Sequence, residues 1–491
     1  MSSILTNNGA MVALQTLSSI NKNLGNVQNQ ISTGKAVGNS KDNSAVWAIS
    51  KVMESDVKGF KSISDSLALG QSTVAVARQA SETVADLLTE MKGKITAAQE
   101  QNVDRSKIQA DIDAYTQQVQ SVIGAAQFNG LNLVSGSDSV DVLSSLDRAS
   151  DGSVASSSIS VSRQDLTTDA GVYNASGTDL SVNATASDTA VVNTGITETL
   201  QLGGTVAVDD VVRLQIGETS VSFTAATTTL DDAAAGLTAA INAAGIEGIT
   251  ATVATDTITL TSTVAFEDTA LTFTATGSTT GTYGTDAALE ARAETVTFSA
   301  TAGVNEGDGY RVTIGSTDFD YVAGQGETME DVARGLKIAV DSAGLSNIST
   351  NVTQDANGAW QLQVDNNSTT LAFSAAGRSD GTATGGLAGL DSIDVTTDEG
   401  ASAALANIET FIGTAIDASA AFGSVEGRIS IQSEFISKLS DSLKSGIGSM
   451  VDANMEETSA RLQALQVQQQ LGVQSLSMAN QAPQSILSLF R

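Results

Sequence analysis

The sequence predicts an α+β multi-domain protein in which the N- and C-terminal helices pair as a coiled coil or helical bundle. Inserted between them are β-rich α+β outer domains built on a tandem repeat. Three observations predict this fold. Apolar residues recur every three or four positions at both ends of the chain, as they do on one face of a helix. The middle is rich in threonine, valine and glycine in short alternating runs, which are typical of strands. Within this middle, one segment returns at a near-constant offset.

The N-terminal part of the chain predicts three helices. The first covers residues 8 to 33 and is broken at Gly34. Asp42 can accept hydrogen bonds from the free amides of a second, unusually long helix that begins near Ser44. A third helix covers residues 104 to 126, where apolar residues alternate steps of four and three in a heptad pattern that favours coiled-coil packing.

The C-terminal part carries the strongest periodic signal, since Phe422, Ile429, Ile436 and Leu443 lie seven residues apart. The last helix has two apolar stripes instead of one. A single partner helix can cover only one stripe, so this helix needs cover on more than one side. The first stripe is Leu462, Leu465, Leu476 and Ala479, and the second is Val467, Leu471 and Met478.

The repeat in the middle has copies at about residues 197 to 277 and 294 to 377. Each copy is interpreted as two strands, a short amphipathic helix and two more strands. We therefore expect two small folding units in tandem, copy 1 in an outer domain of residues 167 to 290 and copy 2 in one of residues 291 to 400. The matching residues are Arg213, Ile216, Gly217, Thr219 and Phe223 in copy 1, and Arg311, Ile314, Gly315, Thr317 and Tyr321 in copy 2.

Composition excludes several classes of function. The 491 residues include no cysteine and no histidine, which removes disulfides, thiolate and imidazole metal ligands, and the side chains most used for acid-base catalysis near neutral pH. Residues 167 to 400 hold 31 acidic and 6 basic residues of a chain whose net charge is −31. Such a field disfavours nucleic acid and anionic membranes as partners. We expect no catalytic, cofactor-binding or metal site, and the sequence indicates a protein that is not an enzyme.

The ends of the chain resemble bacterial flagellin, the subunit of the flagellar filament, in the style of flagellins from alphaproteobacteria. The middle adds a weaker likeness, because residues 230 to 245 resemble a hook-type repeat of flagellin variable regions. Gln30 and Ala36 depart from the family pattern, which often has arginine at these positions. The motifs that carry the resemblance are residues 3 to 8, 31 to 34, 41 to 45, 127 to 130, 479 to 484 and 486 to 489.

The resemblance implies a domain layout and a set of partners. Residues 1 to 44 and 448 to 491 would pair as an inner coiled-coil polymerisation domain, and residues 45 to 166 and 401 to 447 would form a helical outer-core domain. The chain would assemble into a helical homopolymer used for swimming, in contact with hook-associated junction and cap proteins. It would be exported through the flagellar type III apparatus, with an export chaperone on the C-terminal helix, and would be an extracellular component of the flagellum.

The sequence predicts which side chains form these contacts. The two arms hold too few large apolar residues to offset the entropy of ordering them alone, so neighbouring copies must complete their burial. The expected polymerisation interface is Met11, Leu14, Leu17, Leu24, Val27, Ile31, Leu462, Leu465, Leu471, Leu476, Ala479, Leu487 and Leu489. The expected seam of the helical layer is Ile108, Ile112, Val119, Phe422, Ile429, Ile436 and Leu443.

Three alternatives are weighed against this interpretation. A metallopeptidase insert needs a His-Glu-x-x-His helix, and the chain has no histidine. A secreted acidic adhesin that binds calcium is suggested by Asp318 with Asp320 and by Asp355 with Asn357, but neither pair belongs to a full calcium loop. A hook-filament junction protein would share similar helical ends. No stretch is apolar enough to span a membrane and no cleavable secretory signal is visible, so export would occur without cleavage.

Overall fold

The computed structural model describes residues 7–149 and 153–489, with side chains described as far as residue 481. The chain forms two compact units. Unit 1 consists of residues 1–72, 141–160 and 426–491, and unit 2 of residues 73–140 and 161–425. Within the described residues, no helix combines the length and the apolar character needed to cross a membrane.

The three N-terminal helices agree with the expected ranges to within about one residue at each end that the sequence predicted. α1 begins where the Asn7 side chain accepts a hydrogen bond from the amide of Ala10, and it ends at Gly34, whose φ of 69° is left-handed. The expected cap of the second helix was wrong. Asn43 caps it by accepting from the amide of Val46, whereas Asp42 closes the preceding turn by accepting from Gly38 and Asn39. The helices are α1 (Asn8–Thr33), α2 (Ser44–Ala98), α3 (Arg105–Ala125), α6 (Asp398–Val451) and α7 (Met455–Leu489).

Two short hairpins follow α3 in sequence. The first pairs β1 with β2, and the second pairs the longer strands β3 and β4. Gly70 of α2 is buried, and an added Cβ there would lie 2.6 Å from the side chain of Val142 on β3, so the absent side chain lets strand and helix approach closely. The strands are β1 (Gln127–Phe128), β2 (Leu131–Asn132), β3 (Ser139–Arg148) and β4 (Val154–Ser162).

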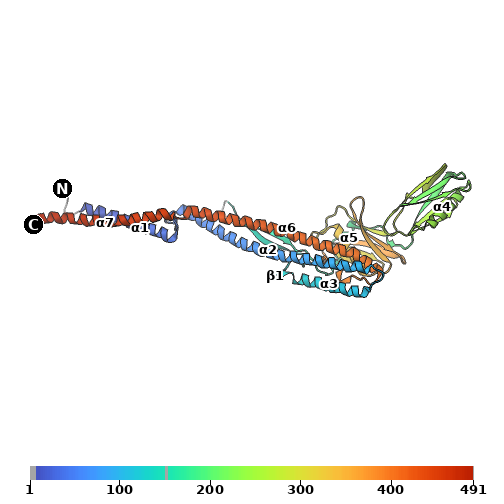
Figure 1. Cartoon of the computed structure of the whole chain (residues 1–491), viewed down its shortest axis with the longest axis horizontal. Helices are drawn as coiled ribbons and strands as arrows, with labels where there is room; N and C mark the ends of the chain where they lie inside the picture. The colour runs from blue at the N-terminus through green and yellow to red at the C-terminus, as the bar shows by residue number, and fades with distance from the viewer. Residues whose placement is uncertain (1–6, 150–152, 490–491) are drawn as a thin grey trace. The chain divides into compact units, whose positions relative to one another are not determined.

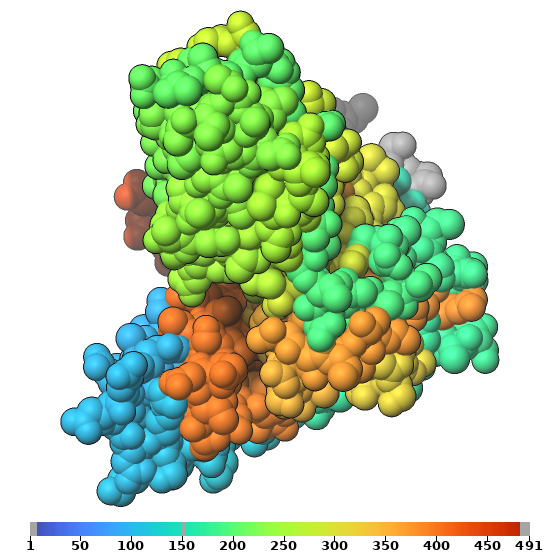
Figure 2. All heavy atoms as spheres, turned by 90° about the vertical axis from the view of Figure 1, so that its right-hand side faces the viewer, coloured from blue at the N-terminus to red at the C-terminus, as the bar shows by residue number. Residues whose placement is uncertain are grey.

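Copy 1 is a pair of four-stranded antiparallel sheets with one helix, α4 (Leu230–Ala244). The sheet orders are β10-β11-β7-β13 and β14-β12-β8-β9. Figure 2 shows this copy as a lobe of its own, coloured green to yellow-green. Its strands are β7 (Ile196–Thr205), β8 (Val211–Ile216), β9 (Thr219–Thr224), β10 (Ile249–Ala254), β11 (Thr257–Ser262), β12 (Thr269–Ala275), β13 (Ser278–Tyr283) and β14 (Ala288–Leu289).

Copy 2 has the same plan around α5 (Met329–Ser342), with sheet orders β18-β19-β15-β5 and β17-β16-β20-β6. Its core buries Phe298, Tyr310, Phe319 and Leu336. Short 3-10 turns η1 (Ser181–Asn183) and η2 (Leu390–Ser392) flank it in sequence. Its strands are β5 (Ala184–Ala186), β6 (Ala190–Val191), β15 (Glu294–Phe298), β16 (Gly309–Ile314), β17 (Thr317–Val322), β18 (Ile348–Gln354), β19 (Trp360–Asn366) and β20 (Leu371–Arg378).

The structure differs from the expected repeat in two respects. Each copy has at least three strands before its helix and at least three after it, where two and two were expected. The first strand of copy 1, β7, pairs with β11, and β12 pairs with β8, so these pairings join segments far apart in the chain and no local hairpin signals them. In addition, β5 and β6 lie before copy 1 in sequence but pair with β15 and β20 of copy 2. Copy 1 is therefore inserted in copy 2. Residues 184–191 were expected in the outer domain of copy 1, residues 167 to 290, but belong to copy 2.

One glycine in each copy allows the helix to pack on an aromatic ring. A Cβ built on Gly335 of α5 would lie 2.2 Å from the Tyr321 ring, and one on Gly236 of α4 would lie 2.2 Å from the Phe223 ring. We expect Gly335→Ala to destabilise copy 2 by about 2–3 kcal/mol, because a packed ring must move. Thermal unfolding measures this loss. Gly413→Ala is the control, since nothing lies within 4 Å of its Cβ position; equal effects at the two sites would contradict the steric explanation.

Candidate polymerisation interface

In unit 1, α1 and α7 lie side by side (Figure 1). The Asn7 side-chain amide donates to the carbonyl oxygen of Ala479 at 2.8 Å, and that of Gln469 donates to Asn21 at 2.7 Å. At the other end, the amide of Ala453 donates to the carbonyl of Gly34 at 2.9 Å, and the amide of Ala36 donates to that of Val451 at 2.7 Å. The two arms are thus held to each other at both ends of the pair.

The pair carries very little charge. Lys22 is the only charged side chain between residues 2 and 34, and no charged residue occurs from residue 462 to residue 490. Surface helices of soluble proteins normally carry a charged face opposite their apolar one. Helices that lack this face can be covered on several sides without burying unpaired charge.

The side chains expected at the interface divide into two groups. Val27 and Leu465 are buried between the helices. Six more side chains are half-buried: Leu17, Leu24, Ile31, Leu462, Leu476 and Ala479. Met11, Leu14 and Leu471 are exposed, at 60%, 55% and 55% of their surface. The side chains of Leu487 and Leu489 lie outside the described residues. The first stripe of α7 therefore faces α1 within the subunit, and the second stripe faces away from it.

The exposed group includes residues that the sequence did not single out. Val12 and Val473 are more than half exposed, as are Val467 and Met478 of the second stripe. Beside Leu471, a groove of about 600 Å³ runs along the pair. Small residues at spacings of three to four positions on both helices were the available sequence signal for this groove. Its lining is Gly9, Val12, Ala13, Thr16, Ile20, Gln468, Leu471, Gly472 and Ser475.

The expected seam of the helical layer is largely interior. Ile112 and Val119 of α3, and Phe422, Ile429 and Ile436 of α6, are all buried, whereas Ile108 and Leu443 are half-buried. In unit 2 the ion pairs Lys92–Glu409 and Lys94–Asp111 join α2 to α6 and to α3. The heptad pattern therefore marks side chains that build each subunit's own core.

Comparisons with known proteins match both ends and the full length of the chain. The model of the bacterial flagellin N-terminal helical region matches residues 4–139, and that of the C-terminal helical region matches residues 405–490. Flagellin A of Rhizobium meliloti is 30% identical over 496 residues, which is 100% of both chains. The chain belongs to the bacterial flagellin family. Flagellin FljO of Caulobacter vibrioides is 40% identical over 139 residues, 28% of this flagellin and 51% of its own length.

This flagellin is a self-polymerising structural subunit of the flagellar filament used for swimming, and it associates with other flagellar proteins. Among solved structures, flagellar hook associated protein-3 of Legionella pneumophila is similar over 82% of this chain and 98% of its own, with 12% identity and a TM-score of 0.31. The full-length likeness to flagellins favours the filament subunit over the junction protein considered from the sequence.

The acidic pairs that suggested calcium have protein partners in the flagellin. The Arg311 guanidinium donates to Asp318 at 2.7 Å and to both oxygens of Asp320 at 2.6 and 2.8 Å. Asp355 accepts from the amides of Asn357 and Ala359 and so closes a hairpin turn. Across the described ranges, no cluster of three or more acidic side chains is arranged to hold a metal ion.

One half-buried carboxyl of the flagellin has a pKa raised toward neutral pH. Glu327 accepts from the Tyr321 hydroxyl at 2.8 Å and from the amide of Gly324 at 3.0 Å. Burial, with a smaller contribution from the negative charges of Asp331 and Asp165, raises the pKa of Glu327 to about 7. The residue lies in a cavity of about 820 Å³ that also contains Asp165 and Asp331.

The raised pKa makes copy 2 sensitive to pH. Folded copy 2 binds this proton more tightly than the unfolded chain does, so its stability is expected to fall as pH rises from about 4.5 to about 7. A shift of this size corresponds to about 2–3 kcal/mol after allowance for partial exposure. Glu327→Gln should remove this loss, measured as the melting temperature at pH 5 and pH 8. Parallel pH profiles for the two proteins would contradict the assignment.

Proposed function

We propose that the exposed apolar face of the α1–α7 pair is the surface through which neighbouring flagellin subunits contact each other. The observation that carries this proposal is that Met11, Leu471 and Met478 are 55–66% exposed on helices with almost no charge. Apolar surface of this kind is stabilised when a second copy covers it. Repetition of one such contact from subunit to subunit generates an open helical polymer.

On this proposal each part of the chain has its own task. Residues 1–44 and 448–491 form the inner tube, and residues 45–166 and 401–447 form the helical layer around it. The two repeat copies, which carry most of the negative charge, face solvent. Leu17, Leu24 and Leu465 hold the two arms together, and the side chains of the second stripe contact neighbouring subunits.

The proposal extends to export and to chemistry. The flagellin leaves the cell through the flagellar type III apparatus, and a cytosolic chaperone covers the uncharged C-terminal helix until then. An uncovered apolar helix is an aggregation hazard, which is the physical reason for such a partner. The flagellin performs no catalysis, in keeping with a chain that lacks histidine and cysteine.

Two matched deletions test the division of tasks. Deleting residues 448–491 should abolish filament formation while the remaining chain stays folded, because the deleted arm supplies the proposed contacts. Joining residue 166 to residue 401 removes far more of the chain, yet should still allow filaments. Electron microscopy of purified, heated and recooled protein gives the readout. Filaments from the first deletion, or none from the second, would refute the proposed assignment.

A further inference from the structure

The edge strands of the two copies occupy equivalent positions. In copy 1 the amide of Leu271 on β12 donates to the carbonyl of Ala287 beside β14, and in copy 2 the amide of Phe373 on β20 donates to that of Thr189 beside β6, both at 2.8 Å. In copy 1, Ala270 lies opposite Ala288, and in copy 2, Ala372 lies opposite Ala190. Val191 and Leu289 are both fully buried. Each copy is thus closed by the same kind of strand pair.

The origin of the strand pair differs between the copies. In copy 1, β13 follows β12 after only residues 276 and 277, and Gly277 has the left-handed φ of 75° that this turn requires. This short turn holds β13–β14 on copy 1. Copy 2 has no strand pair after β20; instead β5 and β6 pair with β15 and β20, at one edge of each of its two sheets. An uncovered edge exposes a row of unpaired amides and carbonyls, so copy 2 depends on this segment.

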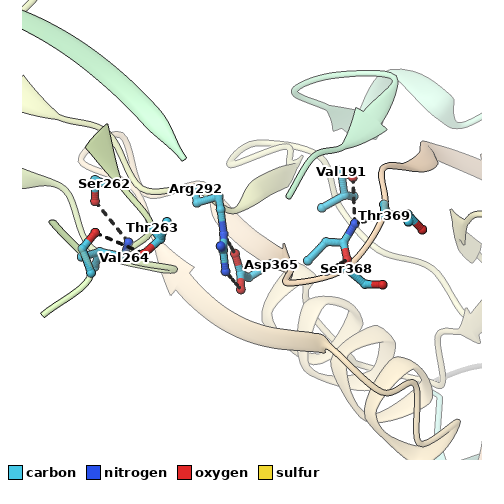
Figure 3. Close-up of polar contacts among 10 residues, drawn as sticks. Val191, Ser262, Thr263, Val264, Arg292, Asp365, Ser368 and Thr369 are labelled. Atoms are coloured by element: carbon cyan, nitrogen blue, oxygen red, sulfur yellow. Dashed lines mark hydrogen bonds and ion pairs between the residues drawn. The ribbon is translucent and has the colours of Figure 1, made fainter. Parts of the chain in front are cut away.

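As a consequence, two stretches join the copies: tether 1 (residues 192–195) and tether 2 (residues 290–293). Consecutive residues at the end of β19, Asp365 and Asn366, form hydrogen bonds at tether 2 and beside tether 1, and Figure 3 shows the contact of Asp365 with Arg292. The side-chain amide of Asn366 donates to the carbonyl of Val191, the last residue of β6 before tether 1, at 3.1 Å. Asp365 accepts from the Arg292 guanidinium of tether 2 at 2.7 and 2.8 Å.

Tether 2 is also bonded to copy 1. The backbone amide of Arg292 donates to the carbonyl of Val264, and that of Ala293 donates to the carbonyl of Ala265, at 2.9 and 3.0 Å. The side chain of Asp268 accepts from the amide of Ala291 at 2.8 Å. Tether 2 therefore has hydrogen bonds to both copies.

We propose that β5–β6 is a strap that closes copy 2 and, by closing it, holds copy 1 on two tethers, so that copy 1 cannot rotate freely about either. In the alternative arrangement, β5–β6 would close copy 1 and β13–β14 would close copy 2. Only one stretch of chain would then join the two copies, and copy 1 could rotate about it. With the strap in place, the outer copy of a filament subunit is braced against rotation.

Four alanines allow the pairing to be tested in the full-length chain, which has no cysteine of its own. Opposed residues next to a hydrogen-bonded pair in antiparallel strands lie within the range that a disulfide spans. The double variants Ala190→Cys/Ala372→Cys and Ala270→Cys/Ala288→Cys should oxidise within one chain. The matched controls Ala190→Cys/Ala270→Cys and Ala288→Cys/Ala372→Cys should not.

Non-reducing electrophoresis and peptide mapping separate the outcomes. Intrachain disulfides in the two controls, with none in the first two variants, would mean that β5–β6 closes copy 1 and β13–β14 closes copy 2. This result would overturn the proposal. A link between residues 190 and 372 that forms only between two chains would overturn it too, since the strap would then come from another subunit. Failure of residues 190 and 372 to link at all would have the same meaning.

The double tether is tested by its effect on motion. A fluorophore on Ser220→Cys of the exposed strand β9 reports rotation of copy 1, and a protease site replaces the exposed residues Asn193 and Thr194 of tether 1. Cutting this site should increase the amplitude of fast anisotropy decay at least twofold over the uncut protein. An unchanged decay would show that one tether suffices to hold copy 1, and would overturn the bracing role.

Discussion

Replacing Leu471 with aspartate is expected to abolish filament growth while leaving the isolated subunit unchanged in stability. Leu471 is 55% exposed and lines the groove beside the α1–α7 pair, so a carboxylate there remains hydrated in the monomer. In the proposed filament a neighbouring subunit covers this position. A buried unpaired carboxylate costs several kcal/mol at every subunit contact. This raises the critical concentration for polymerisation above the protein concentration used in the assay. Sedimentable polymer and the monomer melting curve are the two measurements.

Leu465→Asp provides the matched comparison, because Leu465 belongs to the other stripe of α7. It is only 8% exposed within the subunit, where it packs in the α1–α7 pair. We expect this variant to unpair the arms already in the monomer, visible as faster amide hydrogen exchange in α1. Leu471→Asp should leave that exchange as it is. Wild-type polymer yield from Leu471→Asp would mean that the second stripe faces water in the filament.

The helices could be predicted from sequence because their signals are local. The period of the apolar residues and the left-handed glycine after α1 place its ends at Asn8 and Thr33. Asp42 and Asn43 show the limit of such reasoning. Both residue types cap helices, and the choice between neighbours depends on which side chain the turn already uses. Cap chemistry therefore predicts the start of a helix better than the residue that caps it.

The nesting of the copies could not be predicted, because sheet edges are paired by distant segments. Nothing in the composition of residues 184–191 indicates that they close a core that begins about a hundred residues later. The repeat itself suggested two independent beads. Which partner a short strand finds depends on turn length and on which edges remain open, and both are properties of the folded chain.

The sequence predicted which side chains belong to the candidate interface. It did not predict which of them face the partner helix within the subunit and which are exposed. Periodicity identifies Leu465 and Leu471 as apolar positions on one helix, whereas only the packing of α1 shows which one is already covered. Gly9 and Gly472 had no apolar signal. They matter through the side chains that approach them: a Cβ on Gly472 would lie 3.3 Å from Leu17.

Breaking the ion pair between Arg292 and Asp365 is expected to have the largest effect on the outer region. The two side chains are 7% and 5% exposed, and Arg292 contributes two hydrogen bonds to the carboxylate. The nearby carboxylate raises the pKa of Arg292 further, so the guanidinium stays charged. Asp365→Ala leaves that charge buried without a partner and should destabilise copy 2 by about 3–5 kcal/mol.

Copy 1 supplies the control for this prediction. The strand pair Glu198–Leu260 of copy 1 is equivalent to the pair Glu294–Val364 of copy 2. Counting along the strands from these pairs, Ile196 of copy 1 corresponds to Arg292, and Thr261 corresponds to Asp365. The double variant Arg292→Ile/Asp365→Thr carries the residues of copy 1 and buries no charge. It should recover most of the stability that Asp365→Ala loses, since replacing both members of a buried pair is often nearly neutral. Thermal unfolding of the three proteins measures this. A double variant as unstable as Asp365→Ala would show that the pair stabilises copy 2 through its own attraction and not by avoiding an unpaired charge.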